Sequence, residues 1–234
     1  MVNVSAKVAI VTGGSVGKEL ARGFLEAGAN VAFIYRNPAR GALLTEWFAD
    51  FPDSFLPLQA DLVDPEQAKQ SVSATTDRFG GVDFLLNSLG GWLGGKRLHE
   101  HTNADLQKML SIDLVPTFNI MAAVLPVMAE QKFGRVVNFI STQVFTSGGG
   151  NSVYTASKAA LLALTRAAAE EYKSSGISVN ALAPSTIDTE SNRKAMPAAD
   201  FGKWVKPGEL VDAALFLCGS ENSLNDTILK FPGR

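Results

Sequence analysis

Short runs of β-branched and aliphatic residues alternate along this chain with longer segments in which apolar residues recur every three or four positions. The short runs predict strands, and the longer segments predict helices that bury one face. Strands are predicted at residues 7–12, 30–35, 54–60, 82–87, 135–140, 176–184 and 226–231, and helices at 18–27, 65–79, 103–131, 152–174 and 207–218. We expect Pro116 and Pro126 to kink or interrupt the third helix. Regular alternation of strand and helix predicts an α/β fold, a doubly wound parallel sheet with helices on both faces.

The composition supports one buried sheet of this kind. The chain has 234 residues, of which 46% are hydrophobic and 19% are charged. These values are typical of a single large α/β domain whose parallel strands are covered on both faces. We therefore predict one domain spanning residues 1–234. Residues 185–206 are polar with few strand signals, and we expect them to form a loop.

The charge of the chain narrows its possible partners. The formal net charge is −2, which provides no basic field for nucleic acid or for an anionic membrane. The N-terminus lacks the pattern of a secretion signal, and no apolar stretch reaches the roughly 18 residues that a membrane span needs. We expect a cytoplasmic protein without nucleic-acid or membrane partners. Cys218 lies in an apolar helical run and is expected to be a buried structural thiol, and no histidine has neighbours at metal-ligand spacing, so no metal site is expected.

Gly13 and Gly14 follow the first predicted strand, and a helix and a second strand come after them. This unit is the one that holds the pyrophosphate of a dinucleotide, because unpaired N–H groups at a helix N-terminus favour negative charge. A glycine-rich turn alone is equally compatible with a simple turn. Its place at the start of an alternating β/α chain favours dinucleotide binding.

Tyr154 and Lys158 lie four residues apart in an alanine-rich helical segment, so they share one face of the helix. A neighbouring ammonium group stabilises a phenolate, and we expect it to lower the pKa of Tyr154 from the usual value of about 10. The phenol can then exchange a proton near neutral pH. Ser141, at the end of the 135–140 strand, is placed to hold a substrate oxygen against that phenol. The competing interpretation is a solvated helix face with an apolar ring lying on it.

These features occur in an order that is typical of one family. The chain resembles the short-chain dehydrogenase/reductase family over essentially its whole length. The resemblance rests on five motifs: Thr12-Gly13-Gly14-Ser15-Val16-Gly17, Asp61-Leu62, Asn87-Ser88-Leu89-Gly90, Ser141 with Tyr154 and Lys158, and Pro184-Ser185 followed by Ile187-Asp188-Thr189. It implies a Rossmann-like sheet and an NAD(P)-dependent oxidoreductase. Such an enzyme transfers hydride between nicotinamide and a small-molecule carbonyl or alcohol substrate, with Tyr154 as general acid/base.

The resemblance also assigns residues to roles. It implies catalytic roles for Ser141, Tyr154, Lys158 and Asp113, the last at a helix position where the family usually carries asparagine. It implies cofactor contacts for Gly13, Gly14, Ser15, Val16, Gly17, Tyr35, Arg36, Asp61, Leu62, Asn87, Gly90, Tyr154, Lys158, Pro184, Ile187 and Thr189. Residues 185–206 would lie on the substrate side of the site. Relatives form homotetramers or homodimers through the two long helices, here those that contain Asp113 and Tyr154.

Two departures from the family pattern affect the cofactor site. The family turn is usually Thr-Gly-x-x-x-Gly-x-Gly, and keeping Leu20 and Phe24 in the apolar phase of the helix requires a turn about two residues shorter, ending at Gly17. Tyr35 replaces the acidic residue of NAD-preferring relatives, and Arg36 follows it. A guanidinium group can bind a 2′-phosphate through two bonds, so NADP is expected in preference to NAD. The alternative for Arg36 is an exposed turn residue.

A third departure is Asp113 itself. Its carboxylate either accepts the water bond of the usual asparagine and strengthens the charge of Lys158, or it pairs with Lys158 too tightly and quenches Tyr154. The second possibility is compatible with a non-catalytic dinucleotide-binding sensor or scaffold. Residues 191–201 resemble the corresponding segment of dihydropteridine reductase, which makes quinonoid dihydropteridine reduction a rival substrate assignment. Three aromatic residues are candidates either for stacking on a flat ligand or for ordinary packing: Trp92, Phe145 and Trp204.

Overall fold

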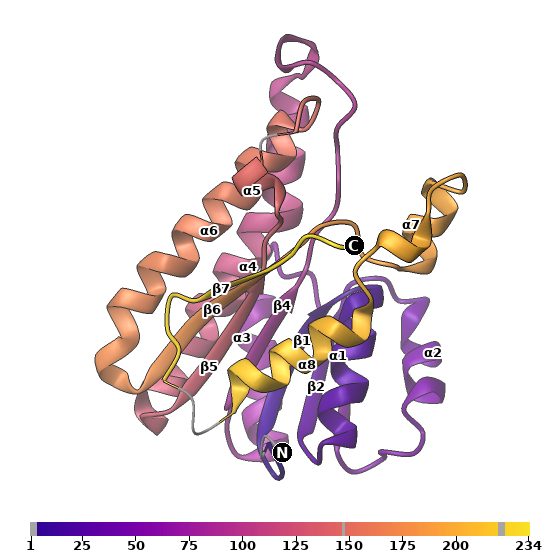
Figure 1. The fold of residues 1–234 in the computed structure, drawn as a ribbon. Coiled ribbons are helices and arrows are strands. Elements are labelled where there is room, and N and C mark those ends of the chain that lie inside the picture. The colour runs from indigo at the N-terminus through magenta and orange to yellow at the C-terminus, as the bar shows by residue number, and fades with distance from the viewer. Residues whose placement is uncertain (1–3, 147, 220–222) are drawn as a thin grey trace.

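The computed structural model describes residues 4–146, 148–219 and 223–234 (Figure 1). Its strands form one parallel sheet in the order β3-β2-β1-β4-β5-β6-β7. The strands are β1 (Val8–Gly13), β2 (Asn30–Tyr35), β3 (Phe55–Gln59), β4 (Phe84–Ser88), β5 (Gly134–Phe139), β6 (Ile177–Pro184) and β7 (Ile228–Phe231). The strand order reverses between β1 and β4, so the two halves of the sheet extend outward from this pair. The predicted doubly wound parallel sheet is confirmed.

Helices cover both faces of the sheet (Figure 1). One face carries α1 (Ser15–Glu26), α2 (Arg40–Trp47) and α8 (Pro207–Cys218), and the other carries α3 (Pro65–Phe79), α4 (Asn103–Gln131) and α6 (Ser152–Tyr172). Two short helices, α5 (Gln143–Thr146) and α7 (Glu190–Ala195), follow the carboxyl ends of β5 and β6. Single 3₁₀ turns lie at Leu98–Glu100, Lys173–Ser175 and Phe201–Lys203.

The strands are buried because helices cover both of their faces. All eight residues of β6 are buried, and successive residues of β1 enter different cores. Ala9 and Val11 pack with α1 and α8, whereas Ile10 packs with α3 and α4. This alternation follows from the two-residue period of a strand, and it explains why the strands read as continuous apolar runs in the sequence.

All predicted strands are present, with ends that move by at most two residues. Pro116 and Pro126 were expected to kink or interrupt the third predicted helix, and neither interrupts it, because α4 runs unbroken past both. Most of the stability of a helix in a folded protein comes from packing, and Pro116 is itself buried. The hydroxyl of Thr117 donates to the Asp113 carbonyl oxygen at 2.8 Å, one turn back along the helix.

The length and apolar composition of α4 would allow it to cross a bilayer. The expectation that no apolar stretch is long enough for a membrane span is therefore wrong. In the fold, however, α4 packs against the sheet and between α3 and α6. Ile120, Val124 and Met128 are fully buried there. The apolar character of α4 is accounted for by its place in the core.

Candidate functional site

The candidate residues gather at the carboxyl ends of β1, β4 and β5. Thr12 on β1 is in register with Asn87 on β4, and Asn87 is in register with Asn138 on β5. Ser141 follows β5 directly, and α6 brings Tyr154 to the same edge of the sheet. In open α/β sheets, ligands bind in the crevice where the strand order reverses. Here that point lies between β1 and β4.

The turn between β1 and α1 requires glycine at its first position. Gly13 has φ +124°, and a Cβ atom on it would lie 2.3 Å from Ser88 Oγ. Gly17 is buried inside the first turn of α1, and Leu20 and Phe24 are fully buried further along. The structure therefore has the shorter turn, with the apolar face of α1 directed into the core.

A cavity of about 290 Å³ opens beside this turn. Seven of the predicted cofactor residues line it: Gly13, Gly14, Tyr35, Arg36, Asp61, Leu62 and Gly90. The remaining lining comes from the same strand ends, the start of α2 and α4: Ile34, Asn37, Arg40, Ala60, Val63, Leu89, Ser111, Ile112 and Pro116. The cavity thus joins a helix N-terminus to two arginine side chains. This arrangement fits a ligand with phosphate groups and an adenosine moiety.

Lys158 is buried and surrounded by acceptors. Its Nζ atom lies 3.0 Å from the carbonyl oxygen of Phe139, 3.4 Å from that of Leu89 and 3.4 Å from Asp113 Oδ1. A Cβ atom on Gly90 would lie 2.9 Å from this Nζ, so glycine leaves room for the ammonium group. Burial lowers the pKa of Lys158, and the charge of Asp113 opposes that effect.

Asp113 is fully buried in α4 and bonds to three partners. Besides facing Lys158, its Oδ2 atom accepts from Ser157 Oγ at 2.5 Å, and its Oδ1 atom accepts from the N–H of Gly91 at 3.2 Å. The separation of 3.4 Å between Asp113 Oδ1 and Lys158 Nζ makes the two side chains an ion pair. A buried ion pair of this kind gains its stability from close geometry and from the additional hydrogen bonds.

Ser141 interacts with Tyr154, and this interaction favours the ionised phenol. Ser141 is buried, and its hydroxyl accepts from the N–H of Gln143 at 3.2 Å. Burial raises the pKa of Tyr154; the interaction with Ser141 opposes this, and the charge of Asp113 adds to it. The expected lowering of this pKa is therefore wrong for this structure, because burial outweighs the interaction with Ser141 and Asp113 places a negative charge nearby.

A model of the short chain dehydrogenase family matches residues 7–200. The chain belongs to the short-chain dehydrogenase/reductase family. It is 31% identical over 232 residues to 2-(R)-hydroxypropyl-CoM dehydrogenase of Xanthobacter autotrophicus, with 92% of each protein covered. It is 30% identical over 226 residues to a 3-oxoacyl-[acyl-carrier-protein] reductase of Synechocystis sp., with 93% of this chain and 91% of that protein covered. Among solved structures it resembles ElxO with NADP bound, with a TM-score of 0.90 and 25% identity over 96% of each chain. The chain is an NAD(P)-dependent oxidoreductase.

In this short-chain dehydrogenase the side chain of Asn87 is buried and bonds to neighbouring strands. Its Nδ2 atom donates to Asn138 Oδ1 at 2.8 Å, and its Oδ1 atom accepts from Thr12 Oγ1 at 3.3 Å. Asn138 in turn donates to Thr165 Oγ1 at 2.9 Å. This buried chain of hydrogen bonds joins the ends of β1, β4 and β5 to α6, the helix that carries the tyrosine and the lysine. Asn138 and Thr165 were not among the predicted site residues.

The other predicted cofactor residues lie outside the cavity lining. Ser15, Val16 and Gly17 form the first turn of α1, and Pro184 ends β6. Ile187 pairs with Val205, and Thr189 Oγ1 caps α7 by accepting from the N–H of Asn192 at 3.3 Å. Residues 185–206 are therefore not only loop, because they contain α7 and a 3₁₀ turn.

The three candidate stacking residues differ in exposure. Trp204 is 9% exposed, and its ring packs on Phe201 with centroids 4.8 Å apart, so it belongs to the interior. Trp92 is 65% exposed, and its Nε1 atom donates to Asn151 Oδ1 at 3.0 Å. Phe145 is 40% exposed, and the Lys230 ammonium group lies 4.0 Å from its ring centroid. Trp92 and Phe145 are accessible to a ligand.

Arg40 lines the cavity but was missed in the sequence. Its Nη1 atom lies 3.6 Å from the place that a Cβ atom on Gly14 would occupy, so its guanidinium group reaches the glycine turn. The available signal was a second arginine four residues after Arg36. It was too weak to use, because α2 buries only Leu44 and has little apolar periodicity.

Proposed function

We propose that this chain is a cytoplasmic enzyme that uses NADPH to reduce carbonyl groups of small molecules, with Tyr154 as the proton donor. The observation that carries the proposal is the closeness of the Tyr154 phenol to the Ser141 hydroxyl at the end of β5. Buried Lys158 lies one helical turn further along α6. The names of two relatives, a dehydrogenase and a 3-oxoacyl reductase, support carbonyl and alcohol chemistry as the class of reaction.

In the proposed reaction, Ser141 and Tyr154 together bind the carbonyl oxygen of the substrate. Tyr154 Oη donates a proton to that oxygen as negative charge develops on it. NADPH, when bound here, would supply the hydride that reduces the carbonyl carbon. Lys158 would hold the ribose of the cofactor and stabilise the phenolate that remains. Because its pKa is raised, Tyr154 is protonated at neutral pH, which favours proton donation and hence reduction.

Asp113 has a supporting role in this proposal. Burial lowers the pKa of Lys158, and the carboxylate 3.4 Å away opposes that effect. We propose that Asp113 keeps Lys158 charged and fixed in place while Tyr154 exchanges its proton. The alternative, a dinucleotide-binding protein without turnover, would require this pairing to abolish activity.

We propose NADP as the preferred cofactor, with NAD as the weaker one. Arg36 and Arg40 both line the cavity next to Tyr35, where NAD-preferring relatives carry an acidic residue. Guanidinium groups bind phosphate oxygens through two hydrogen bonds, and a 2′-phosphate offers such oxygens. The NADP bound to ElxO in its solved structure supports the same preference.

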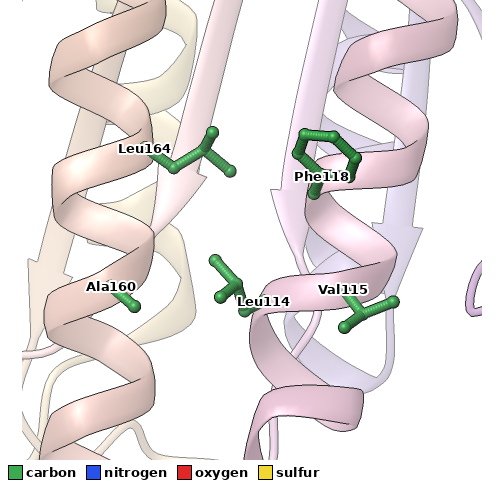
Figure 2. Close-up of a pocket in the computed structure, with 5 residues that line it drawn as sticks. All are labelled: Leu114, Val115, Phe118, Ala160 and Leu164. Atoms are coloured by element: carbon green, nitrogen blue, oxygen red, sulfur yellow. The ribbon is translucent and has the colours of Figure 1, made fainter.

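We also propose a homodimer or homotetramer that is formed through α4 and α6. An apolar groove of about 280 Å³ runs between these helices and is lined by Leu114, Val115, Phe118, Ala160 and Leu164. Figure 2 shows Leu114 on α4 directed toward Ala160 and Leu164 on α6, with Val115 and Phe118 further around α4. Phe118 is 53% exposed. A second copy of this surface would cover the groove and bury its large apolar side chains.

The test is turnover by wild type and by Tyr154→Phe, with NADPH oxidation followed across ketones, quinones, a 3-oxoacyl thioester and a quinonoid dihydropteridine. We expect the variant to lose about 10²- to 10⁴-fold in rate, because it lacks the proton donor. Its Kd for NADPH should remain close to that of wild type. Tyr172→Phe, the same change at the end of α6, is the matched control and should be fully active.

Three outcomes would contradict parts of this proposal. Unchanged turnover in Tyr154→Phe would refute the assignment of the proton donor. Stabilisation of the wild-type protein by NADPH, without oxidation by any substrate, would favour the non-catalytic binder. Turnover with the quinonoid dihydropteridine and with no other compound would show that the substrate is a dihydropteridine rather than a carbonyl compound.

A further inference from the structure

Residues 185–206 leave the end of β6 and return to nearly the same point before α8. Ile187 pairs with Val205, the N–H of Asp188 donates to the Val205 carbonyl oxygen at 2.8 Å, and the N–H of Val205 donates to the Thr186 carbonyl oxygen at 3.0 Å. These bonds close the segment at its base. Its contents, α7 and the turn at Phe201–Lys203, therefore form a small unit beyond the carboxyl ends of the strands (Figure 1).

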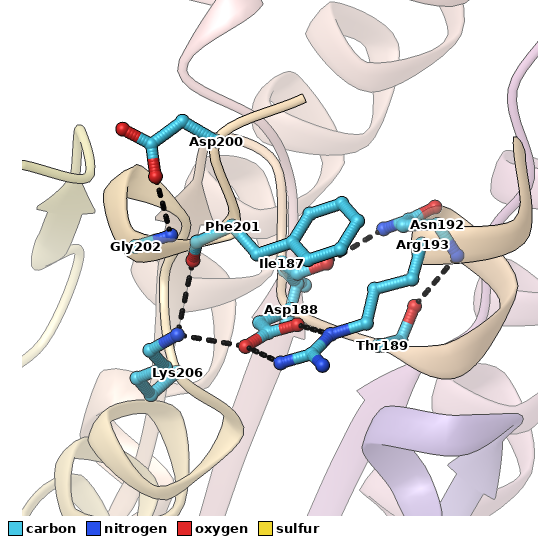
Figure 3. A network of polar contacts seen from close by, with 9 residues as sticks. All are labelled: Ile187, Asp188, Thr189, Asn192, Arg193, Asp200, Phe201, Gly202 and Lys206. Carbon is cyan, nitrogen blue, oxygen red and sulfur yellow. Dashed lines mark hydrogen bonds and ion pairs between the residues drawn. The ribbon is translucent and has the colours of Figure 1, made fainter. Parts of the chain in front are cut away.

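The carboxylate of Asp188 lies at the centre of this unit (Figure 3). Its side chain is only 7% exposed. Arg193 donates from Nε to Oδ1 at 2.5 Å and from Nη2 to Oδ2 at 2.8 Å, and Lys206 Nζ donates to Oδ2 at 2.7 Å. Hydrogen bonds from Arg193 and Lys206 hold the pKa of Asp188 far below its usual value. Three charge-assisted donors thus converge on one carboxylate.

The two cations that contact Asp188 come from different parts of the segment. Arg193 belongs to α7, whereas Lys206 is the residue before α8 and also donates to the Phe201 carbonyl oxygen at 3.0 Å. A second ion pair on α7, Glu190 with Lys194, joins side chains that are 80% and 75% exposed. Exposed pairs of that kind contribute little to stability. The Asp188 pairs differ because they are shielded from solvent on the carboxylate side and join the two ends of the segment.

The residues on either side of Asp188 are the ones assigned to the cofactor. The carbonyl oxygen of Ile187 accepts from Asn192 Nδ2 at 2.8 Å, and Thr189 Oγ1 accepts from the N–H of Asn192. Both bonds involve Asn192, which lies in α7 next to Arg193. They therefore depend on the position of α7, which the bonds between Arg193 and Asp188 help to fix. The backbone around Asp188 is therefore ordered by contacts within the segment, before any ligand binds.

We infer that Asp188 is a positioning residue whose bonds to Arg193 and Lys206 preassemble the backbone from Ile187 to Thr189 for the cofactor. The inference rests on the proposed function, and on the family resemblance that assigns Ile187 and Thr189 to cofactor binding. A preassembled surface binds without paying the entropy of ordering a loop. Loss of these bonds weakens cofactor binding more than it slows the chemical step.

The test compares Asp188→Asn and Lys206→Met with two controls. Lys206→Arg keeps the positive charge, and Glu190→Gln removes the exposed pair from the same helix. Asp188→Asn and Lys206→Met are expected to raise both the Kd and the KM for NADPH about tenfold, with kcat changed by less than about threefold. Amide hydrogen exchange across residues 186–206 should become faster in these two variants. Both controls should remain close to wild type.

Each result bears on the inference. An unchanged Kd for NADPH in Asp188→Asn, or hydrogen exchange as slow as in wild type, overturns the positioning role and leaves the proposed function standing. Equal weakening by Glu190→Gln also overturns it, because the effect would then not depend on the Asp188 contacts. If wild type itself does not bind NADPH, the proposed function fails, and the positioning role fails with it.

Discussion

Replacing Asp113 with asparagine removes the charge that faces Lys158 but keeps an oxygen that can accept hydrogen bonds. At their separation of 3.4 Å the two charges attract by about 5 kcal/mol at an effective dielectric constant of about 20. Removing one partner from a buried pair costs about 3–5 kcal/mol, because it leaves a buried charge without compensation. We expect the lower limit, about 3 kcal/mol at neutral pH, which corresponds to a decrease in Tm of about 6–12 °C.

The loss of stability in Asp113→Asn depends on pH with a definite sign. Burial lowers the pKa of Lys158 and Asp113 opposes this, so the variant lowers that pKa further. A lysine whose folded-state pKa is below its unfolded value of about 10.4 binds fewer protons when folded, and stability then rises with pH up to that value. The variant should therefore regain stability between neutral pH and about pH 10, whereas wild type changes less.

Asp113 also raises the pKa of Tyr154, so the alkaline limb of carbonyl reduction should move to lower pH in the variant.

The measurements are thermal unfolding and kcat/KM for reduction, both as a function of pH. The matched control is Asp105→Asn on the same helix, because Asp105 faces Lys96 at 3.5 Å with side chains that are 20% and 47% exposed. An exposed pair contributes at most about 1 kcal/mol, so this control should lose much less stability than Asp113→Asn. Equal losses in the two variants, or an unchanged pH profile in Asp113→Asn, would refute the reasoning that burial gives the Lys158 pair its strength.

Two further predictions concern the cofactor and the assembly. Arg36→Ala and Arg40→Ala should each weaken NADPH binding roughly 10- to 100-fold in calorimetry, as expected for a lost charged hydrogen bond, with little change for NADH; equal losses for both cofactors would contradict a 2′-phosphate site. Phe118→Glu should convert the proposed dimer or tetramer to a monomer in light scattering, because it places a charge in the apolar groove, whereas Leu43→Glu on α2 should leave the assembly intact. A wild-type protein that is already monomeric would contradict the proposed interface.

The parts of the fold with a strong apolar period were predictable from the sequence. The strands and long helices each bury a regular set of side chains, so their positions follow from local pattern. By contrast, α2 buries only Leu44, and α7 buries no residue at all. Helix α7 forms because Thr189 caps its N-terminus and Asp188 bonds to Arg193. Contacts of that kind depend on the tertiary fold, and no local pattern indicates them.

The same distinction applies to the candidate site. Ser141, Tyr154 and Lys158 could be placed together because β5 and α6 are consecutive elements and both end at one edge of the sheet. The pairing of Asp113 with Lys158 could be given only as one of two alternatives, because the contact depends on the register between α4 and α6, which the sequence does not specify. The direction of the Tyr154 pKa shift depends on burial and on that contact. It was therefore predicted with the wrong sign.

The charge around Tyr154 affects the pH range in which each direction of the proposed reaction is fast. Reduction requires the neutral phenol, whereas oxidation of an alcohol requires the phenolate, which takes up the proton. Burial favours the neutral phenol, and the charge of Asp113 adds to that effect. The ratio of kcat/KM for the two directions is fixed by the equilibrium of the reaction, so Asp113→Asn cannot change it. We expect instead that the alkaline limb of reduction and the acid limb of oxidation both move to lower pH in Asp113→Asn, and limbs that stay in place would contradict a charge effect of Asp113 on Tyr154.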